Sequence, residues 1–355
     1  MAQAHFNNTD AAATFIAADA LQYFVSPLFL GEEVLSGMDV MTEVKGITDL
    51  DHFAAASFLT TADNGLSWAG KQYGAYTNPR ISPVRVEVEV SMNGNNYYNK
   101  VKGQVLRSGT DKDNVDGTIL KQIGSEILMQ GIKADFNRQL WFCDGAKVAV
   151  GTGAVVSNAA HYKLYTGIFA ALAAKCLDAQ KITTKWNTTA VTTDRATLVL
   201  AAMYAAATPE LKELPKKFYV SGAIADAYTD ELVGAGNHVA YADGQSGIPN
   251  LRFRGIPLVV RRDWDALLSA ESAAIVTTAG SIVNAGITGA AATNAQYRAA
   301  LIADNAVVVG TDFNGSSVES WYNRDEKELR FRLGYLCDTV LLDAKLAVTY
   351  ISAIQ

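Results

Sequence analysis

The chain has 355 residues, enough for two or more domains that each bury a core. Hydrophobic residues make up 49% and charged residues 19%, which excludes a disordered protein. The formal net charge of -6 excludes an overall basic field that would draw the chain onto nucleic acid or an anionic membrane.

The cysteine content and the N-terminal segment narrow the possible class of protein further. Three widely spaced cysteines, Cys143, Cys176 and Cys337, fit neither a disulfide framework nor a metal knuckle, so we expect buried small hydrophobic side chains. The N-terminus lacks a basic segment followed by an apolar core, so no secretion signal is predicted. The longest weakly polar run, residues 196–208, is shorter than the roughly 20 residues that cross a bilayer, and no membrane contact is expected.

The first 113 residues predict an arm and a hairpin. Residues 10–26 have the apolar stripe of an amphipathic helix, which Pro27 ends. In VRVEVEV, 84–90, the valines alternate with charges, which predicts a strand with one buried and one wet face. Residues 97–106 are the expected return strand after a turn at 92–95. Because a lone ribbon is marginally stable, it must lie on this chain or on a neighbour.

Residues 116–142 predict the strongest helix of the chain. Ile119, Ile123, Ile127, Ile132, Phe136 and Leu140 recur near four-residue spacing, with charges on the other faces. At about 1.5 Å per residue, such a helix would be close to 40 Å long.

The remainder alternates helices and strands. Alanine-rich helices are predicted over 162–177 and 194–207, a strand over 217–221, and a helix over 222–233. Two strand-like runs at 251–260 turn on Gly255. Residues 273–295 are interpreted as an insertion that carries a loop. Further strands are predicted at 306–310, 329–336 and 344–351.

No motif predicts a catalytic, cofactor or metal site. GLSWAGKQ, 65–72, falls one residue short of a phosphate-binding loop because Gln72 replaces Ser or Thr, and Gly74 and Pro79 deny it a following helix. The four histidines are isolated, without ligand spacing. We therefore expect no enzyme and no cofactor.

Four arginines around residue 255 offer two interpretations: Arg252, Arg254, Arg261 and Arg262. They could contact phosphate, or they could form a solvated strand face or an inter-subunit salt bridge. Asp263 and Asp265 stand beside them, and Arg252 and Arg254 alternate with apolar residues, so the second interpretation is favoured.

The order of elements resembles that of tailed-bacteriophage major capsid proteins, the Hong Kong 97-type fold. The resembling stretches are KFYVSGAIADAYTDEL (217–232), GIPNLRFRGIPLVV (247–260), ADNAVVVGTDFNG (303–315) and LRFRLGYLCDTVLLDAKLAVTY (329–350). The resemblance implies an α+β fold with these segments: N-terminal arm 1–55, E-loop 56–113, spine helix and first part of the P-domain 114–160, A-domain 161–304, P-domain return strands 305–337, and a C-terminal strand, 338–355, returning to the A-domain.

The function implied by the resemblance is self-assembly. Pentamers and hexamers would close an icosahedral shell around double-stranded DNA, in a virion assembled in the host cytoplasm. Other expected partners are a portal, a separate scaffolding protein or none, a decoration protein, and packaged DNA held non-specifically. An encapsulin-like compartment and an α/β phosphate-binding enzyme are the alternatives.

Seven residues are the expected inter-subunit contacts: Trp68, Lys71, Arg85, Glu87, Glu89, Arg252 and Arg254. Covalent cross-linking occurs in part of the resembled family. Lys71, Lys100 or Lys102 could supply the amine and Asn323 the acceptor, but nothing in the sequence selects them.

Overall fold

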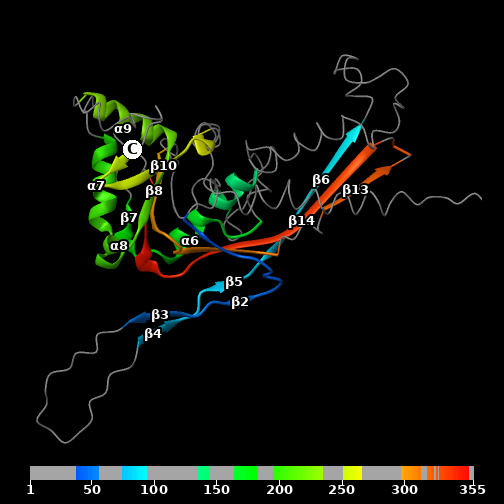
Figure 1. Ribbon diagram of the computed structural model, residues 1–355, viewed down its shortest axis with the longest axis horizontal. Helices are drawn as coiled ribbons and strands as arrows, with labels where there is room; N and C mark the ends of the chain where they lie inside the picture. The colour runs from blue at the N-terminus through cyan, green and yellow to red at the C-terminus, as the bar shows by residue number, and fades with distance from the viewer. Residues whose placement is uncertain are drawn as a thin grey trace, which may run out of the picture.

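The computed structural model describes residues 37–55, 74–93, 135–143, 164–182, 195–234, 251–265, 297–312 and 318–351, except 324 and 327 (Figure 1). Two larger sheets, two short two-stranded ladders and several helices make up this part of the chain. The helix predicted over 10–26, the return strand over 97–106 and the insertion at 273–295 lie outside the described residues. Of the long helix predicted over 116–142, residues 135–142 are described and are helical.

The first sheet has six strands of mixed direction. Its order is β7 (Lys181–Ile182), β15 (Ala347–Ile351), β11 (Arg298–Ala303), β8 (Lys216–Ser221), β10 (Ile256–Arg261) and β9 (Arg252–Phe253). Strands β8 and β10 run parallel, whereas β11 is antiparallel to both β8 and β15. The runs at 251–260 form the predicted hairpin, because Gly255 adopts the left-handed φ of 81° that its turn needs.

Helices α7 (Arg195–Ala206) and α9 (Gly222–Gly234) lie on this sheet, and the 3-10 turn η3 (Asp178–Gln180) precedes β7 (Figure 1). Helix α6 (Ile168–Lys175) contacts both β15 of this sheet and β14 (Glu328–Leu341) of the second sheet, and the short helix α8 (Pro209–Glu213) follows α7. Helices α7 and α9 confirm the predictions over 194–207 and 222–233 within a residue or two. Helix α6 starts later than the predicted residue 162, because Thr166 and Gly167 bond elsewhere. The Thr339 hydroxyl donates to the Thr166 carbonyl at 2.5 Å, and the Gly167 amide donates to the Cys143 carbonyl at 2.8 Å.

The second sheet is built around the 14-residue strand β14 (Glu328–Leu341). Strand β12 (Val307–Thr311) and strand β13 (Val318–Asn323) pair with its two ends, and β1 (Asp39–Met41) extends the sheet beyond β12. Strand β6 (Val84–Asn93) pairs with β14 over ten residues, from Val84 opposite Cys337 to Asn93 opposite Glu328. The predicted strand VRVEVEV therefore belongs to this sheet, a pairing between segments more than 230 positions apart that local sequence does not reveal.

A separate hairpin projects away from both sheets (Figure 1). Its ladders are β2 (Thr48–Asp49) with β5 (Arg80–Ile81), and β3 (His52–Ala55) with β4 (Gly74–Thr77). At its base, Ile81 is fully buried against Val44, Val308 and Val340. A Cβ on Gly310 would come within 2.8 Å of Ile81, so the absence of a side chain there lets the base pack closely. The sequence analysis did not predict these ladders.

One hydrophobic core connects the two sheets. Its centre is an aromatic cluster of Trp141, Phe142, Phe169 and Trp264, whose ring centroids lie 4.7–5.7 Å apart. After β14, the 3-10 turn η7 (Ala344–Leu346) redirects the chain, and β15 then enters the first sheet. The strand that was predicted over 344–351 therefore begins three residues later, at Ala347.

Candidate assembly surfaces

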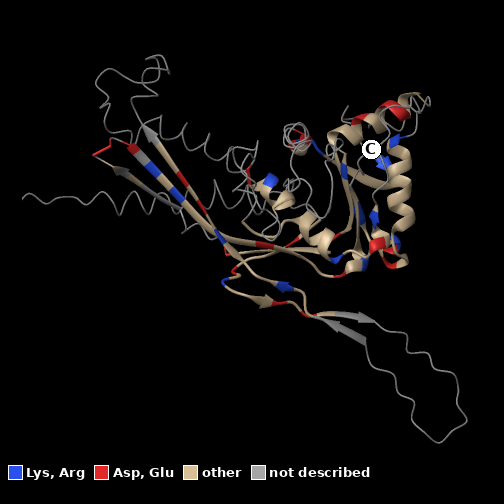
Figure 2. Ribbon diagram, turned by 180° about the vertical axis from the view of Figure 1, so that it is seen from behind, with Lys and Arg blue, Asp and Glu red and all other residues tan. Residues whose placement is uncertain are grey.

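The charged face of β6 and β14 carries three of the predicted contact residues. Within the chain, Arg332 donates to Glu87 at 3.0 Å and lies 3.5 Å from the carboxylate of Glu89. Arg85 pairs with Glu87 at 2.7 Å. Figure 2 shows the resulting interleaved row of basic and acidic residues on the two strands. The hydrogen bond from Arg332 is the main cause that lowers the pKa of Glu87.

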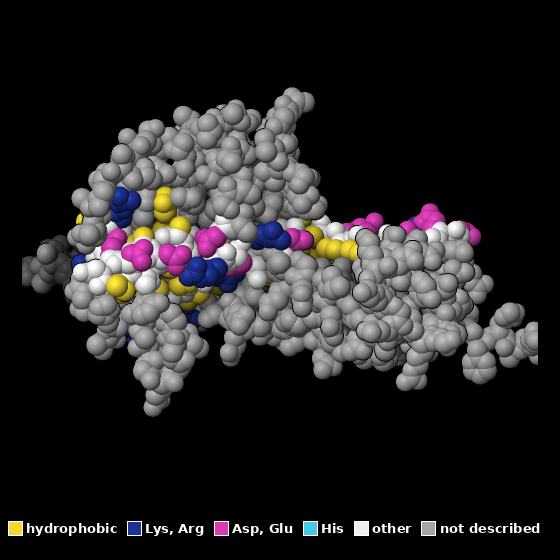
Figure 3. Space-filling view, turned by 90° about the horizontal axis from the view of Figure 1, so that it is seen from above, with side chains coloured by type: hydrophobic (Ala, Val, Ile, Leu, Met, Phe, Trp, Pro, Cys, Tyr) yellow, Lys and Arg dark blue, Asp and Glu magenta, His cyan; other side chains and the backbone are white. Residues whose placement is uncertain are grey.

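These ion pairs leave charge available to a second molecule. The Arg85 side chain is 68% exposed and that of Glu89 is 69% exposed, so both can make further contacts. In the view of Figure 3, acidic and basic side chains of the described residues stand close together along a band, with hydrophobic ones between them. Contact of Arg85, Glu87 and Glu89 with a neighbouring subunit stays a prediction.

The opposite face of β6 is buried only in its middle. Val86 is 3% exposed, whereas Val84 and Val90 at the two ends are 40% and 38% exposed. The expectation of one fully buried face is therefore wrong at these two positions. On strand β13, Trp321 lies opposite Arg330 and is 43% exposed.

Strand β9 carries Arg252, and the turn that follows it carries Arg254. Both are exposed, and they alternate with buried Leu251 and Phe253, as expected of the solvated face of a strand. The Arg254 guanidinium lies 4.9 Å from the ring centroid of Tyr204 on α7, a cation–π contact within the chain. This geometry does not test whether either arginine contacts a neighbouring subunit, so that contact stays a prediction.

The four arginines do not form one patch. Arg261 is buried and pairs with Asp263 at 3.0 Å, whereas Arg262 is exposed and binds Asp226 with two hydrogen bonds, of 2.7 and 3.3 Å. The alternative of a phosphate-gripping cluster formed by all four therefore lacks the required geometry.

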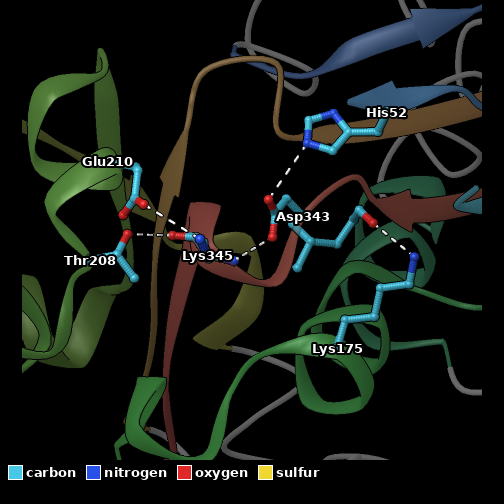
Figure 4. Close-up of polar contacts among 7 residues, drawn as sticks. His52, Lys175, Thr208, Glu210, Asp343 and Lys345 are labelled. Atoms are coloured by element: carbon cyan, nitrogen blue, oxygen red, sulfur yellow. Dashed lines mark hydrogen bonds and ion pairs between the residues drawn. The ribbon is translucent and has the colours of Figure 1, made fainter. Parts of the chain in front are cut away.

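A polar cluster joins the hairpin to the rest of the molecule (Figure 4). His52 of β3 lies 3.6 Å from the carboxylate of Asp343, in the link between β14 and β15. The Lys345 amide donates to Asp343 at 3.0 Å, and the Thr208 hydroxyl donates to the Lys345 carbonyl at 2.8 Å. Lys345 also pairs with Glu210 of α8 at 3.5 Å. The hairpin, the second sheet and α8 thus meet at a single link.

Asp338 is a structural residue that the sequence analysis missed. It is buried in β14, and its two oxygens accept the amides of Ser82 and Thr166 at 2.7 and 3.3 Å. Burial is the main cause that raises the pKa of this carboxyl. Asp338 therefore ties the hairpin exit and the start of α6 to β14; a carboxylate inside the apolar run LGYLCDTVLL was the available signal.

Several sequence predictions concern residues that the structure leaves undescribed or finds buried. Trp68, Lys71 and the whole of GLSWAGKQ, 65–72, lie outside the described residues, as do Lys100 and Lys102. The three cysteines are buried, as predicted, and burial raises the pKa of Cys176 to about 12. Among the residues described, no group of three His, Cys, Asp or Glu side chains is placed to hold a metal ion. Within these same ranges, every helix is too short or too polar to span a membrane.

Comparisons with known proteins identify the fold. No family model and no curated protein matches the chain. Among solved structures, a chain of the satellite phage P4 procapsid that includes the size determination (Sid) protein has a TM-score of 0.54 at 10% identity, covering 97% of this chain and 90% of that chain. The capsid of Ralstonia phage GP4 gives 0.54 at 12% identity, covering 94% and 91%.

A third solved structure has the same architecture outside a phage. The holo-SrpI encapsulin complex from Synechococcus elongatus PCC 7942 gives a TM-score of 0.51 at 12% identity, covering 93% of this chain and 89% of that chain. At these identities the similarity concerns the fold. The chain therefore has the α+β fold of these phage capsid chains, the Hong Kong 97-type fold that the sequence resemblance implied.

Proposed function

We propose that this chain is the major capsid protein of a tailed bacteriophage, a structural protein that assembles into pentamers and hexamers of an icosahedral shell around double-stranded DNA. The observation that carries the proposal is a similarity to phage capsid structures extending over at least nine-tenths of both chains. No reaction is required of it. Portal, scaffolding and decoration proteins are proposed partners of the same particle, and the virion is its proposed location.

The segments of the resembled fold can be assigned on this basis. The six-stranded sheet with its helices corresponds to the A-domain, and the sheet around β14 corresponds to the P-domain. The hairpin of β2 to β5, in which residues 56–73 connect β3 to β4 in the sequence, corresponds to the E-loop. The E-loop is thus proposed to be shorter than 56–113, because β6 pairs with the P-domain strand β14.

The surfaces of the described residues suit assembly. The hairpin base is fixed by Ile81 and by the His52–Asp343 contact, while its ladders extend away from the body (Figure 1). A projecting hairpin of this kind can reach a second subunit. Mixed charges and a net charge of -6 fit a shell that encloses DNA without binding it tightly.

Electron microscopy of the purified chain, alone and with a candidate scaffold, tests the proposal directly. We expect capsomers or closed shells. Replacing residues 56–73 by a short Gly-Ser turn should abolish assembly and leave the far-UV circular dichroism and the melting temperature of the body unchanged. A strictly monomeric wild-type protein, under all these conditions, would contradict the proposal.

A matched replacement separates the reach of the hairpin from its side-chain contacts. A Gly-Ser segment of the same length as 56–73 keeps the reach but removes Trp68 and Lys71. We expect this variant, and then Trp68→Ala and Lys71→Ala singly, to assemble less completely than wild type. Assembly at wild-type yield by the equal-length replacement would remove both residues from the proposed contacts.

The encapsulin similarity supports a second candidate, a compartment that encloses protein cargo. Particles purified from the native source distinguish the two. Nuclease-protected DNA and a portal at one vertex favour the capsid, whereas a co-purifying enzyme with little nucleic acid favours the compartment.

A further inference from the structure

A buried arginine at the start of β11, a central strand of the six-stranded sheet, has an unusual environment. Arg298, the first residue of β11, is 1% exposed. Within the described part of the chain, none of its three guanidinium nitrogens has a hydrogen-bond partner. The guanidinium carbon lies 5.3 Å from the centroid of the Phe169 ring. A buried charge is normally paired, and no described residue supplies the counter-charge that this arginine requires.

The sheet register places Arg298 in a row of polar residues. Ala299 pairs with Val220, so the next positions along the ladder set Arg298 beside Ser221 of β8. On the other side of β8, Arg261 of β10 pairs with Ser221. Because neighbours in register share a face of the sheet, the three side chains lie in line on one face. The Ser221 hydroxyl is also buried without a hydrogen-bond partner in the described part of the molecule.

Indole donors border the same face. Phe169 lies 5.4 Å from Trp141 and 5.3 Å from Trp264, centroid to centroid. The indole nitrogens of both tryptophans are buried, and among the described residues neither has an acceptor. Hydrogen-bond donors are therefore in excess around one aromatic cluster.

The two carboxylates that follow Arg261 in the sequence already have partners. Asp263 pairs with Arg261 at 3.0 Å, and Asp265 accepts the Gly222 amide at the start of α9 at 2.9 Å. Burial lowers the pKa of Arg298 to about 9, so the guanidinium still carries its charge at neutral pH. The cation–π contact with Phe169 offsets only part of the cost of removing that charge from water.

We propose that Arg298 and Ser221, beside Arg261 at the carboxyl ends of β8 and β10, bind a small oxyanion of the phosphate class. A planar guanidinium presents paired donors that match two oxygens of such an anion, and the hydroxyl and indole groups supply further donors. The anion would provide the counter-charge that none of the described residues supplies. This site is independent of the assembly role, so it can be tested on unassembled chain.

Inorganic phosphate is the probe for wild-type protein. The melting temperature of the purified full chain is measured at neutral pH in sodium phosphate and in sodium chloride of equal ionic strength, and titration calorimetry gives the stoichiometry. We expect a higher melting temperature in phosphate, increasing with concentration, and one phosphate per chain. Acetate in a parallel series separates a carboxylate from a tetrahedral anion. Equal melting temperatures in phosphate and chloride, with no calorimetric binding, would overturn the proposal.

Two substitutions sharpen the test. Arg298→Met removes the unpaired charge, so the variant should lose the phosphate-dependent shift and melt in chloride at or above the wild-type temperature. Arg298→Lys keeps a charge without the planar fork and should bind phosphate roughly tenfold more weakly. Arg262→Met, which removes an exposed arginine paired with Asp226, is the control and should keep the full phosphate shift. A large drop in the melting temperature of Arg298→Met in chloride would show that the chain itself supplies the counter-charge, and the site would be refuted.

Discussion

The two sheets differ in how their faces are covered. All six residues of β11, in the middle of the six-stranded sheet, are buried. Aromatic contacts extend from Tyr219 to Trp141 on one face and from Phe218 to Phe253 on the other. Strand β6 of the second sheet exposes one charged face and both ends of its apolar face. The first sheet is thus stabilised within the subunit, while the second leaves surface that assembly can cover.

A tryptophan in each region offers the strongest contrast. Trp141 is fully buried among Phe169, Tyr219 and Trp264, so Trp141→Ala should lower the free energy of unfolding by about 3–5 kcal/mol. Trp321→Ala, at an exposed site on β13, is the matched control and should change it by less than about 1 kcal/mol. Urea denaturation of the unassembled chain measures both. Similar losses from the two variants would end the distinction between the sheets.

Two valines on the same face of β6 make a finer comparison. Val86→Asp places a carboxylate in the core and should cost about 3 kcal/mol or more, because a buried unpaired charge is strongly destabilising. Val90→Asp, at the exposed end of the strand, should cost less than about 1 kcal/mol in the unassembled chain but reduce assembly. Denaturation and particle yield are compared for both. Unimpaired assembly by Val90→Asp would show that no neighbour covers this end of β6.

Asp338 predicts a pH dependence of the second sheet. Because its folded-state pKa is raised above the ordinary value of 3.8, Asp338 binds a proton more tightly in the folded chain. Its contribution to stability is therefore fully present below that value and decreases as the pH rises through the folded-state pKa. The stability of wild type minus that of Asp338→Asn should fall over this range in urea titrations. A difference that rises with pH would contradict the raised pKa.

The Asn substitution should also weaken the sheet at every pH. Its amide group offers one acceptor oxygen where the carboxylate uses two, so the Ser82 or the Thr166 amide loses its partner, at a cost of about 1–3 kcal/mol. Asp312→Asn is a matched control, because this carboxylate accepts the amide of Leu336 through one oxygen in the same sheet. A loss for Asp312→Asn as large as that for Asp338→Asn would show that the second acceptor is unimportant.

The smallest loss of stability is expected from substitutions on the charged face of β6 and β14. Arg332→Gln removes exposed ion pairs with Glu87 and Glu89, so stability should fall slightly at low salt and not at all at high salt. The comparison variant is Arg330→Gln, because Arg330 lies two residues before Arg332 on the same face of β14. A salt-independent loss for Arg332→Gln would mean that the face is more shielded from solvent than its exposure indicates.

Local pattern alone determined several elements of this protein. Helices α7 and α9, strands β8 and β12, and the turn at Gly255 follow from apolar periodicity and from glycine conformation, which depend on neighbours in sequence. Burial of the cysteines followed from their number and spacing. The order of these elements was also enough to indicate the fold that the solved structures confirm.

The tertiary structure decided what depends on distant partners. The charges of β6 predicted a strand with a wet face, but only the pairing with β14 placed that strand in a sheet and its glutamates beside Arg332. The hydrogen bonds of Asp338 and the ring contact of Arg298 likewise join segments more than 120 residues apart in sequence. Register across a sheet is set by the packing of whole strands, which the sequence of one strand does not contain.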